Sequence, residues 1–303
     1  MSNAHGQTAN SKPELEGSPR GLFVIDKPSG ITSRKALNQI ERRLELDGIG
    51  HCGSLDPLAT GVLVLVSGKA RKIQDLIVKG EKGYDMTVTF GATSDTDDGE
   101  GEIVATEPAP EPPTREAIEE ALKVFQGEVM QIPPTYSALK VEGKRMHSEA
   151  RKGRPVKAEP RPVVIHEVEL TRYEWPEADV VIRCGPGTYA RAIARDLGQA
   201  LGTGGYMSRL ERTRVGPLTL DDAVSLEELD RDDMLGIEAF LKDHARLNVP
   251  LTQRHLLLRG QTLRTPPGFP MADPCFAWVN GEVIAHIAFV NGGTHFRTKR
   301  LLV

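Results

Sequence analysis

Residues 50–61 read Gly50-His51-Cys52-Gly53-Ser54-Leu55-Asp56-Pro57-Leu58-Ala59-Thr60-Gly61 and connect a segment of helical periodicity to the apolar run at residues 62–66. Three glycines permit unusual backbone angles, and Pro57 fixes the conformation just after the carboxylate of Asp56. A loop that is this costly to order is typical of a binding or catalytic site. The alternative is that Asp56 only organises a turn or caps a helix. The GxxxxGK[ST] spacing of a phosphate-binding loop is absent.

The composition predicts a soluble, cytoplasmic protein with a substantial core. The chain has 303 residues, 39% of them hydrophobic, which suits one large domain or two moderate ones. No apolar run approaches the roughly 20 residues that cross a bilayer, and the stretch before Gly21 lacks a signal-peptide hydrophobic region. Cys52, Cys184 and Cys275 lie far apart without a CxxC pair, so we expect reduced thiols.

The charge is unevenly distributed along the chain. A net charge of -4 and a pI near 6.1 argue mildly against a nucleic-acid partner. Basic residues nevertheless outnumber acids between residues 140 and 161, in a glycine- and proline-containing segment typical of an exposed loop. The segment is either an ordinary solvated face or a surface for a polyanion. Its basic residues are Lys140, Lys144, Arg145, Arg151, Lys152, Arg154, Lys157 and Arg161.

The pattern of elements predicts an α+β fold with a mixed sheet. Residues 1–20 have almost nothing to bury and are expected to form a disordered tail. Strands are predicted at 22–25, 84–91, 163–173 and 178–184, and helices at about 33–46, after Thr114, and over 189–201. Strands interrupted by isolated helices favour this fold class.

A second domain is predicted from residue 245 to residue 303. Residues 276–279, the Asn280-Gly281 dipeptide and residues 283–289 give a strong hairpin signal, and another strand follows residues 291–293. We place the boundary of the first domain, residues 21–244, at the end of a helix-like stretch.

Five ordered stretches resemble the TruB family of pseudouridine synthases. Residues 50–61 are similar to its GHxGxLDPxAxG signature, in which the aspartate, here Asp56, is catalytic. The chain departs from the family at Gly48, Cys52 and His147, where lysine, threonine and tyrosine are common. The other stretches are Lys27-Pro28-Ser29-Gly30-Ile31-Thr32-Ser33, Lys82-Gly83-Tyr84, Pro133-Pro134-Thr135-Tyr136-Ser137-Ala138-Leu139-Lys140 and Gly187-Thr188-Tyr189-Ala190-Arg191.

The resemblance implies conversion of uridine to pseudouridine at position 55 of the tRNA T loop. Asp56 would be the nucleophile, attacking either C6 of the base or C1′ of the ribose. Arg191 would pair with Asp56 and lower the pKa of its carboxyl. Tyr84 would stack on the flipped uracil and could help remove the C5 proton, the alternative being a core aromatic.

Further contacts follow from the same resemblance. Tyr189 and Leu210 would line the uracil pocket, and His51 and Lys27 would bind the substrate. The RNA backbone would be bound by basic side chains that fix its position. These are Lys140, Lys144, Arg145, Arg151 and Lys152.

The resemblance also implies the overall organisation. We expect a pseudouridine synthase catalytic domain followed by a small C-terminal β-barrel, PUA-like RNA-binding domain. The expected partner is tRNA, with no membrane, no guide RNA and a monomeric state. No cofactor and no metal are expected, because the acidic stretch from Asp95 lacks the glycine and glutamate positions of a calcium loop.

Two other functions fit the same residues. One is an RNA-binding or RNA-folding protein in which catalysis is secondary or lost, against which Asp56 argues. The other is a guide-RNA-dependent synthase of the dyskerin type. The short C-terminal segment without a lysine-rich tail favours a stand-alone, bacterial-type enzyme.

Overall fold

A computed structural model describes residues 20–137, 140–141, 144–145 and 158–303. The disordered tail predicted at residues 1–20 lies outside them except for its last residue. Within the described residues, ten strands form one mixed sheet, in which β1 and β3 pair antiparallel and β3 and β12 pair parallel. Its main path runs β14-β1-β3-β12-β4-β11-β10-β7, with β2 beside β3 and β13 beside β12. The mixed sheet predicted from the sequence is therefore confirmed.

The strands of this sheet are β1 (Gly21–Lys27), β2 (Gly50–His51), β3 (Thr60–Ser67), β4 (Lys82–Phe90), β7 (Gly127–Gln131), β10 (Arg161–Glu174), β11 (Glu177–Cys184), β12 (Gly205–Val215), β13 (Leu218–Thr219) and β14 (Val224–Ser225). Two small hairpins are β5 (Ala92–Ser94) with β6 (Ile103–Ala105), and β8 (Lys140–Val141) with β9 (Lys144–Arg145).

Both faces of the central strands are buried. In β1, Phe23 and Ile25 point into one apolar cluster, whereas Leu22 and Val24 point into another. This follows from the two-residue period of a strand, which sends successive side chains to opposite faces. It also explains why β1 and β3 are nearly continuous apolar runs.

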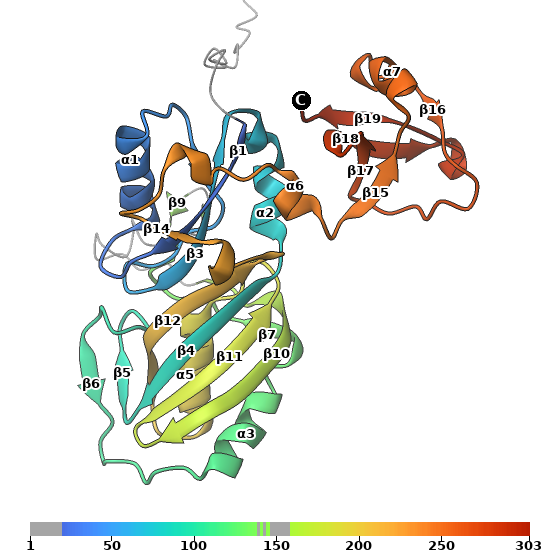
Figure 1. Cartoon of the computed structure of the whole chain (residues 1–303). Coiled ribbons are helices and arrows are strands. Elements are labelled where there is room, and N and C mark those ends of the chain that lie inside the picture. The colour runs from blue at the N-terminus through green and yellow to red at the C-terminus, as the bar shows by residue number, and fades with distance from the viewer. Residues whose placement is uncertain (1–19, 138–139, 142–143, 146–157) are drawn as a thin grey trace, which may run out of the picture.

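The helices cover the first face. The apolar side chains of α1, α3 and α5 pack with Phe23 and Ile25 in the first cluster. Thr32 and Thr114 cap the first two of these helices by accepting a hydrogen bond from Lys35 N and Ala117 N. In Figure 1, α3 and α5 lie against the sheet of β4, β10, β11 and β12. The helices are α1 (Ser33–Arg43), α2 (Gln74–Lys79), α3 (Arg115–Lys123), α5 (Ala190–Ala200), α6 (Glu238–Leu241) and α7 (Arg254–Leu258).

Short 3-10 helices complete the connections. They are η1 (Gly68–Ile73), η2 (Leu220–Asp222), η3 (Arg231–Asp233), η4 (Leu251–Gln253) and η5 (Asn291–Gly293).

A second sheet follows the main sheet in the chain. Its order is β15-β17-β18-β19-β16, and it has its own apolar cluster around Leu257, Ile284 and Phe296. The turn predicted at Asn280-Gly281 joins β17 to β18, and both of its residues have positive φ angles of 50° and 84°. The strands are β15 (Ala245–Asn248), β16 (Leu263–Arg264), β17 (Cys275–Val279), β18 (Glu282–Val290) and β19 (His295–Leu301).

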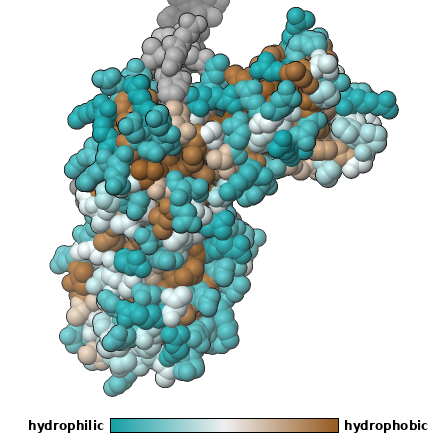
Figure 2. All heavy atoms as spheres, in the orientation of Figure 1, coloured by the Kyte–Doolittle hydropathy of each residue, from teal (hydrophilic) through white to brown (hydrophobic). Residues whose placement is uncertain are grey.

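The two sheets share part of one core. Phe276, Trp278 and Leu302 of the second sheet pack in the same cluster as Leu22 and Val24 of β1, together with apolar side chains of α2 and α6. Figure 1 shows the second sheet beside α2 and α6, set away from the lower strands of the main sheet. On the face seen in Figure 2, hydrophilic side chains cover most of the surface and apolar side chains appear between them.

Two further comparisons with the sequence predictions are informative. The first helix ends at Arg43 rather than near Leu46, because Glu45 adopts a positive φ of 47° that an α-helix does not contain. The described part of the chain contains no helix of the length and apolarity that a bilayer crossing requires.

Candidate active site

The loop at residues 50–61 is hydrogen-bonded to Lys27, the last residue of β1, and to the segment that follows this strand. Ser33 Oγ accepts a hydrogen bond from Leu55 N at 2.8 Å and donates to Leu55 O at 3.2 Å. Lys27 is fully buried, and its Nζ donates to backbone carbonyls that include Pro57 O at 3.3 Å. Ser29 Oγ donates to Leu58 O at 2.9 Å. The stretch at residues 27–33, which resembles the family, therefore fixes the conformation of the loop at residues 50–61.

Asp56 faces an arginine of helix α5. The Arg191 Nε atom lies 3.0 Å from Asp56 Oδ2, and Arg191 Nη2 donates to Asp56 Oδ1 at 3.3 Å. The Arg191 side chain is only 6% exposed, whereas that of Asp56 is 38% exposed. A planar guanidinium that contacts both carboxylate oxygens fixes the orientation of the carboxylate. The pair expected from the sequence is thus present, with the carboxylate on the solvent side.

A second carboxylate holds Arg191 from the other side. Asp98 is 2% exposed, and its Oδ2 lies 3.3 Å from Arg191 Nη1. Its Oδ1 accepts hydrogen bonds from Thr96 Oγ1 at 2.6 Å and from Glu100 N at 3.1 Å. Sequence reasoning missed Asp98, because the acidic stretch between β5 and β6 lacks the spacing of a calcium loop and resembles a family loop after the Tyr84 strand to which no site residue was assigned.

The same acidic turn contacts α5 a second time. Arg195, one helical turn after Arg191, donates from Nη1 to Asp97 Oδ2 at 2.8 Å. Because residues four apart share one face of a helix, the two arginines meet two successive aspartates. The turn is also fixed to β12 by Gly99 N and Met207 O at 2.9 Å. The acids at this point of the sequence are therefore the partners of the α5 arginines.

The pKa of the Asp56 carboxyl differs from the one expected from the sequence. The sequence predicted that Arg191 would lower it below the ordinary range. The pKa is instead raised, because desolvation by the surrounding protein and the charge of Asp98 outweigh the lowering by Arg191 and Lys27. A carboxylate that is costly to keep charged is a stronger base and a more reactive nucleophile than an exposed one.

Tyr84 and Arg212 form a cross-strand pair beside Asp56. They are directly opposite each other in β4 and β12, so their side chains leave the same face of the sheet. Burial raises the pKa of the Tyr84 hydroxyl, and the nearby charge of Arg212 offsets part of that rise. Arg212 is 1% exposed and donates to Val62 O at 2.7 Å and Gly53 O at 3.2 Å.

Arg212, which lines the cavity beside Asp56, is the second residue of this site that the sequence analysis did not single out. Among the residues that the structure describes, no carboxylate lies within ion-pair distance of it, which is unusual for a buried charge. Its strand, β12, is not among the strands predicted from the sequence, and its burial could not be predicted either, since Arg209 and Arg214 of the same strand look alike in the sequence.

These side chains line one cavity of about 270 Å³. It brings together five of the residues singled out in the sequence: Asp56, Tyr84, Tyr189, Arg191 and Leu210. The rest of its lining comes from the loop, α2, β4, Tyr136, the turn before α5 and β12. Those residues are Gly53, Ser54, Leu55, Val78, Lys82, Tyr136, Gly185, Gly187, Thr188, Ala190 and Arg212.

Tyr189 is held firmly at the start of α5. Two hydrogen bonds to Gln131 fix its backbone. Tyr189 N donates to Gln131 Oε1 at 2.8 Å, and Gln131 Nε2 donates to Tyr189 O at 3.1 Å. The guanidinium of Arg161 lies 5.0 Å from the centre of the Tyr189 ring. The ring is therefore a fixed wall of the cavity.

Two predicted substrate contacts do not line this cavity. Lys27 lies behind the loop, where desolvation lowers the pKa of its amine to about 8. His51 lies on β2, and its pKa is lowered mainly by burial. The buried His51 Nδ1 has no hydrogen-bond partner among the described residues. Their direct contact with a substrate stays a prediction.

The predicted RNA-backbone residues are only partly described. The backbones of Lys140, Lys144 and Arg145 belong to the β8–β9 hairpin. Arg151 and Lys152 lie outside the described residues, as does His147.

Two departures from the family pattern have structural settings. Gly48 has a φ of 67°, which glycine adopts without strain. Cys52 is fully buried behind the loop, and burial raises the pKa of its thiol to about 12, so this thiol is not a nucleophile.

Two solved structures of larger particles contain a chain with the same fold. A chain in the crystal structure of a Cbf5-Nop10-Gar1 complex matches with a TM-score of 0.73 at 21% identity, over 93% of this chain and 85% of that chain. A chain in the structure of an H/ACA RNP bound to a substrate RNA containing 2′-deoxyuridine matches with a TM-score of 0.71 at 19% identity, covering 93% of this chain and 85% of that one. At these identities the likeness concerns the fold alone.

Comparison of the sequence with known proteins identifies the family. Residues 41–190 match the N-terminal domain of TruB family pseudouridylate synthase, and residues 191–244 match the tRNA pseudouridylate synthase B C-terminal domain. The chain is 40% identical over 255 residues to tRNA pseudouridine synthase B of Aromatoleum aromaticum, covering 82% of each chain. It is 41% identical over 250 residues to the protein of that name from Mycobacterium bovis, covering 80% of this chain and 84% of the relative. This chain therefore belongs to the TruB family of pseudouridylate synthases.

Proposed function

We propose that the protein converts uridine to pseudouridine at position 55 in the T loop of tRNA. The observation that carries this proposal is the ionic chain Asp56–Arg191–Asp98, which ends with a solvent-facing carboxylate in a cavity that Tyr84 and Tyr189 also line. The relatives at about 40% identity are named tRNA pseudouridine synthase B, which supports a tRNA substrate.

Asp56 is the proposed nucleophile. The reaction breaks the N1–C1′ bond of uridine, turns the detached uracil and joins C5 to C1′; C5 loses its proton to solvent and N1 gains one, with no net oxidation or hydrolysis. Attack of the carboxylate on C6 or on C1′ starts from the ionised form of Asp56 in both cases. Arg191 keeps that form available and keeps the carboxylate oriented, and Asp98 keeps Arg191 in place.

Tyr84, Tyr189 and Leu210 form the proposed uracil site. A base inside a folded RNA must leave its stack before a side chain can reach C1′ or C6. Aromatic side chains recognise such an extruded base through its π face, at about 1–3 kcal/mol per stacked base. Burial and the charge of nearby Asp56 both raise the pKa of the Tyr84 hydroxyl and keep it protonated, so for Tyr84 to help remove the C5 proton it must pass its own proton on as it takes the new one.

RNA binding is proposed to use two further regions. Basic residues 140–161 would position the RNA backbone, and residues 245–303 would form a PUA-like RNA-binding domain. The latter proposal is supported by the separate five-stranded sheet and by charge, because residues 245–303 hold seven lysines and arginines against two acids. Their net charge of +5 stands in a chain whose total is -4.

We also propose that the enzyme is a cytoplasmic monomer that needs neither guide RNA nor a metal or organic cofactor. The support is the match to relatives named tRNA pseudouridine synthase B, which covers 82% and 84% of their length. The alternative of a guide-dependent synthase has the same fold and differs in what must be added for activity.

Tritium release separates these possibilities. The purified protein is incubated with unmodified tRNA labelled at C5 of uracil, without guide RNA or added metal, next to Asp56→Asn. We expect release by the wild type and none by the variant. A position-55 U→C tRNA is the matched substrate control. Release that persists in Asp56→Asn, or that requires a guide RNA, would contradict the proposal.

A further inference from the structure

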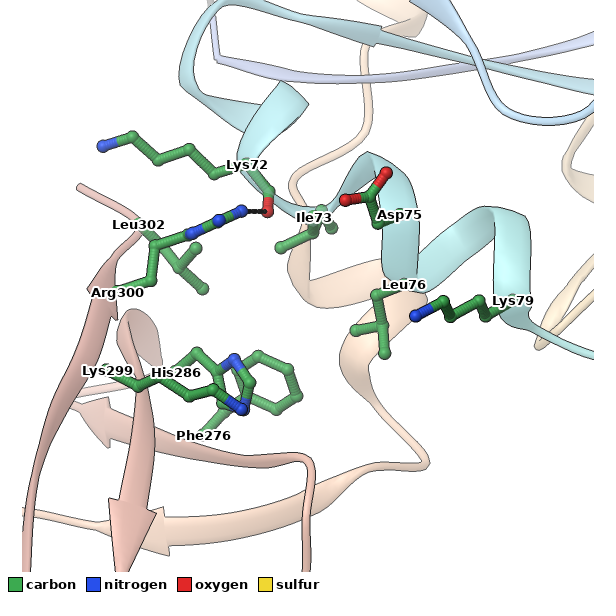
Figure 3. Close-up of a pocket in the computed structure, with 10 residues that line it drawn as sticks. All are labelled: Lys72, Ile73, Asp75, Leu76, Lys79, Phe276, His286, Lys299, Arg300 and Leu302. Atoms are coloured by element: carbon green, nitrogen blue, oxygen red, sulfur yellow. Dashed lines mark hydrogen bonds between the residues drawn. The ribbon is translucent and has the colours of Figure 1, made fainter. Parts of the chain in front are cut away.

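A second cavity lies at the junction of the two sheets. It also measures about 270 Å³ and is bounded on one side by η1 and α2 and on the other by β17, β18 and β19 (Figure 3). We call it the junction cleft. It is lined by Lys72, Ile73, Asp75, Leu76, Lys79, Phe276, His286, Lys299, Arg300 and Leu302.

The walls of the junction cleft are cationic. Lys72 and Lys79 come from one wall, Lys299 and Arg300 come from the other, and Asp75 is the only acid in the lining. Like charges placed on facing walls repel one another, so a bound anion stabilises the arrangement.

Most of this positive charge is available to a ligand. Among the residues that the structure describes, neither Lys72 nor Lys79 has a carboxylate within 4.0 Å. Lys299 has only an exposed pair with Asp273 at 3.7 Å, and such pairs contribute little free energy. Arg300 is the exception, since its Nη1 donates to Lys72 O at 2.8 Å and so joins the two walls.

The floor of the cleft is rigid and apolar. Phe276 and Leu302 are each 1% exposed and belong to the core that the two sheets share. His286 lies over Phe276, with ring centres 5.2 Å apart. Figure 3 shows these rings between β19 and α2, below Arg300. The charged walls are therefore held at a fixed spacing instead of being carried by flexible loops.

The position of α2 relates the cleft to the active site. Val78 lines the catalytic cavity, whereas the next residue, Lys79, lines the junction cleft. A helix with its side chains is about 10–12 Å across, so the two cavities are separated by roughly that distance. An RNA whose uridine occupies the catalytic cavity brings its own phosphates close to the cleft, which makes this RNA the nearest polyanion.

We propose that the junction cleft binds phosphate groups of the tRNA backbone, at a point where the RNA passes over α2 away from the modified uridine. The inference depends on tRNA being the substrate. It adds a contact that neither the motifs nor the basic segment at residues 140–161 indicated. Binding on both walls also places the second sheet in contact with the same RNA that the main sheet modifies.

The test removes one lysine from each wall. The double variant Lys72→Ala/Lys299→Ala is compared with Lys123→Ala/Lys242→Ala, which removes the same charge from exposed sites outside both cavities. Binding of unmodified tRNA is measured at several salt concentrations, together with kcat and KM for tritium release. Loss of two phosphate contacts should reduce the slope of log K against log salt by about 1–2. KM should rise and kcat at saturating tRNA should stay as in the wild type, while the control pair keeps the wild-type slope.

Three results would overturn the proposal. One is an unchanged salt slope in the cleft variant. Another is a fall in kcat without a change in slope, which would assign the lysines to the catalytic site. The third comes from adding AMP as a free phosphate ester: if AMP binds in a Lys72-dependent manner but tRNA does not displace it, the cleft serves a small nucleotide. Failure of the wild type to release tritium would instead count against the proposed function.

Discussion

Removing the charge of Asp98 should slow catalysis without unfolding the protein. Asp98→Asn keeps an oxygen that can accept from Thr96 Oγ1 and Glu100 N, which lie 2.6 Å and 3.1 Å from Oδ1. It removes the ionic contact between Asp98 Oδ2 and Arg191 Nη1 at 3.3 Å. A hydrogen bond to a charged group contributes about 1.5–3 kcal/mol. If that energy serves to position Arg191 for the transition state, kcat falls roughly 10- to 150-fold.

The assay is single-turnover tritium release over a range of pH. The charge of Asp98 raises the pKa of Asp56, so its removal should move the acidic limb of the rate profile to lower pH while the rate falls. Asp97→Asn is the matched control, because Asp97 pairs with Arg195, which does not contact Asp56. A wild-type kcat in Asp98→Asn, or an unmoved acidic limb, would refute the assigned role; so would an equal effect of Asp97→Asn.

Other predictions concern the loop and its partners. Because burial raises the pKa of Asp56 and the ionised form reacts, wild-type tritium release should decline on acidification at a higher pH than that at which an exposed aspartate protonates. Because the pKa of Asp56 is higher in the folded than in the unfolded protein, ionisation of Asp56 at pH 7 costs the folded state free energy. Asp56→Asn should therefore be at least as stable as the wild type in denaturant melts at pH 7, and a clear loss of stability would contradict this. Gly61→Ala should cost roughly 2–5 kcal/mol in urea unfolding, since φ is 94° and the added carbon would lie 2.3 Å from Arg212 O, whereas Gly127→Ala, at a φ of 96° in open space, should cost less. Arg212→Lys keeps a charge but loses the guanidinium fork that donates to Val62 O and Gly53 O, and should lower kcat more than KM; a change in KM alone would argue against it.

The sequence predicted the local elements well because their determinants are local. The Asn280-Gly281 turn between alternating apolar residues needs only two residues with positive φ, and both have it. The cap at Thr114 depends on a hydrogen bond to Ala117, three residues away. Where a determinant was not a simple pattern, as at the positive φ of Glu45, the predicted end of the helix was wrong.

The active site was predicted less completely because its partners are distant in the chain. The motif singled out Asp56 and Arg191, which are 135 residues apart, but gave no reason to connect Asp98 with them. An acidic turn on the surface and an acidic turn inserted against α5 have the same composition. For the same reason the sequence did not predict that the pKa of Asp56 is raised. The rise comes from burial of Asp56 and from its proximity to Asp98, and both arise only when the chain is folded.

The core that the two sheets share makes their junction part of a domain interior and not a hinge. Phe276, Trp278 and Leu302 cannot separate from Leu22 and Val24 without exposing buried apolar surface. The second sheet therefore keeps a fixed position relative to the main sheet, and a shortened chain ending before it would expose an apolar, aggregation-prone face. A ligand that touches both sheets would therefore meet two surfaces whose spacing is fixed by this shared core.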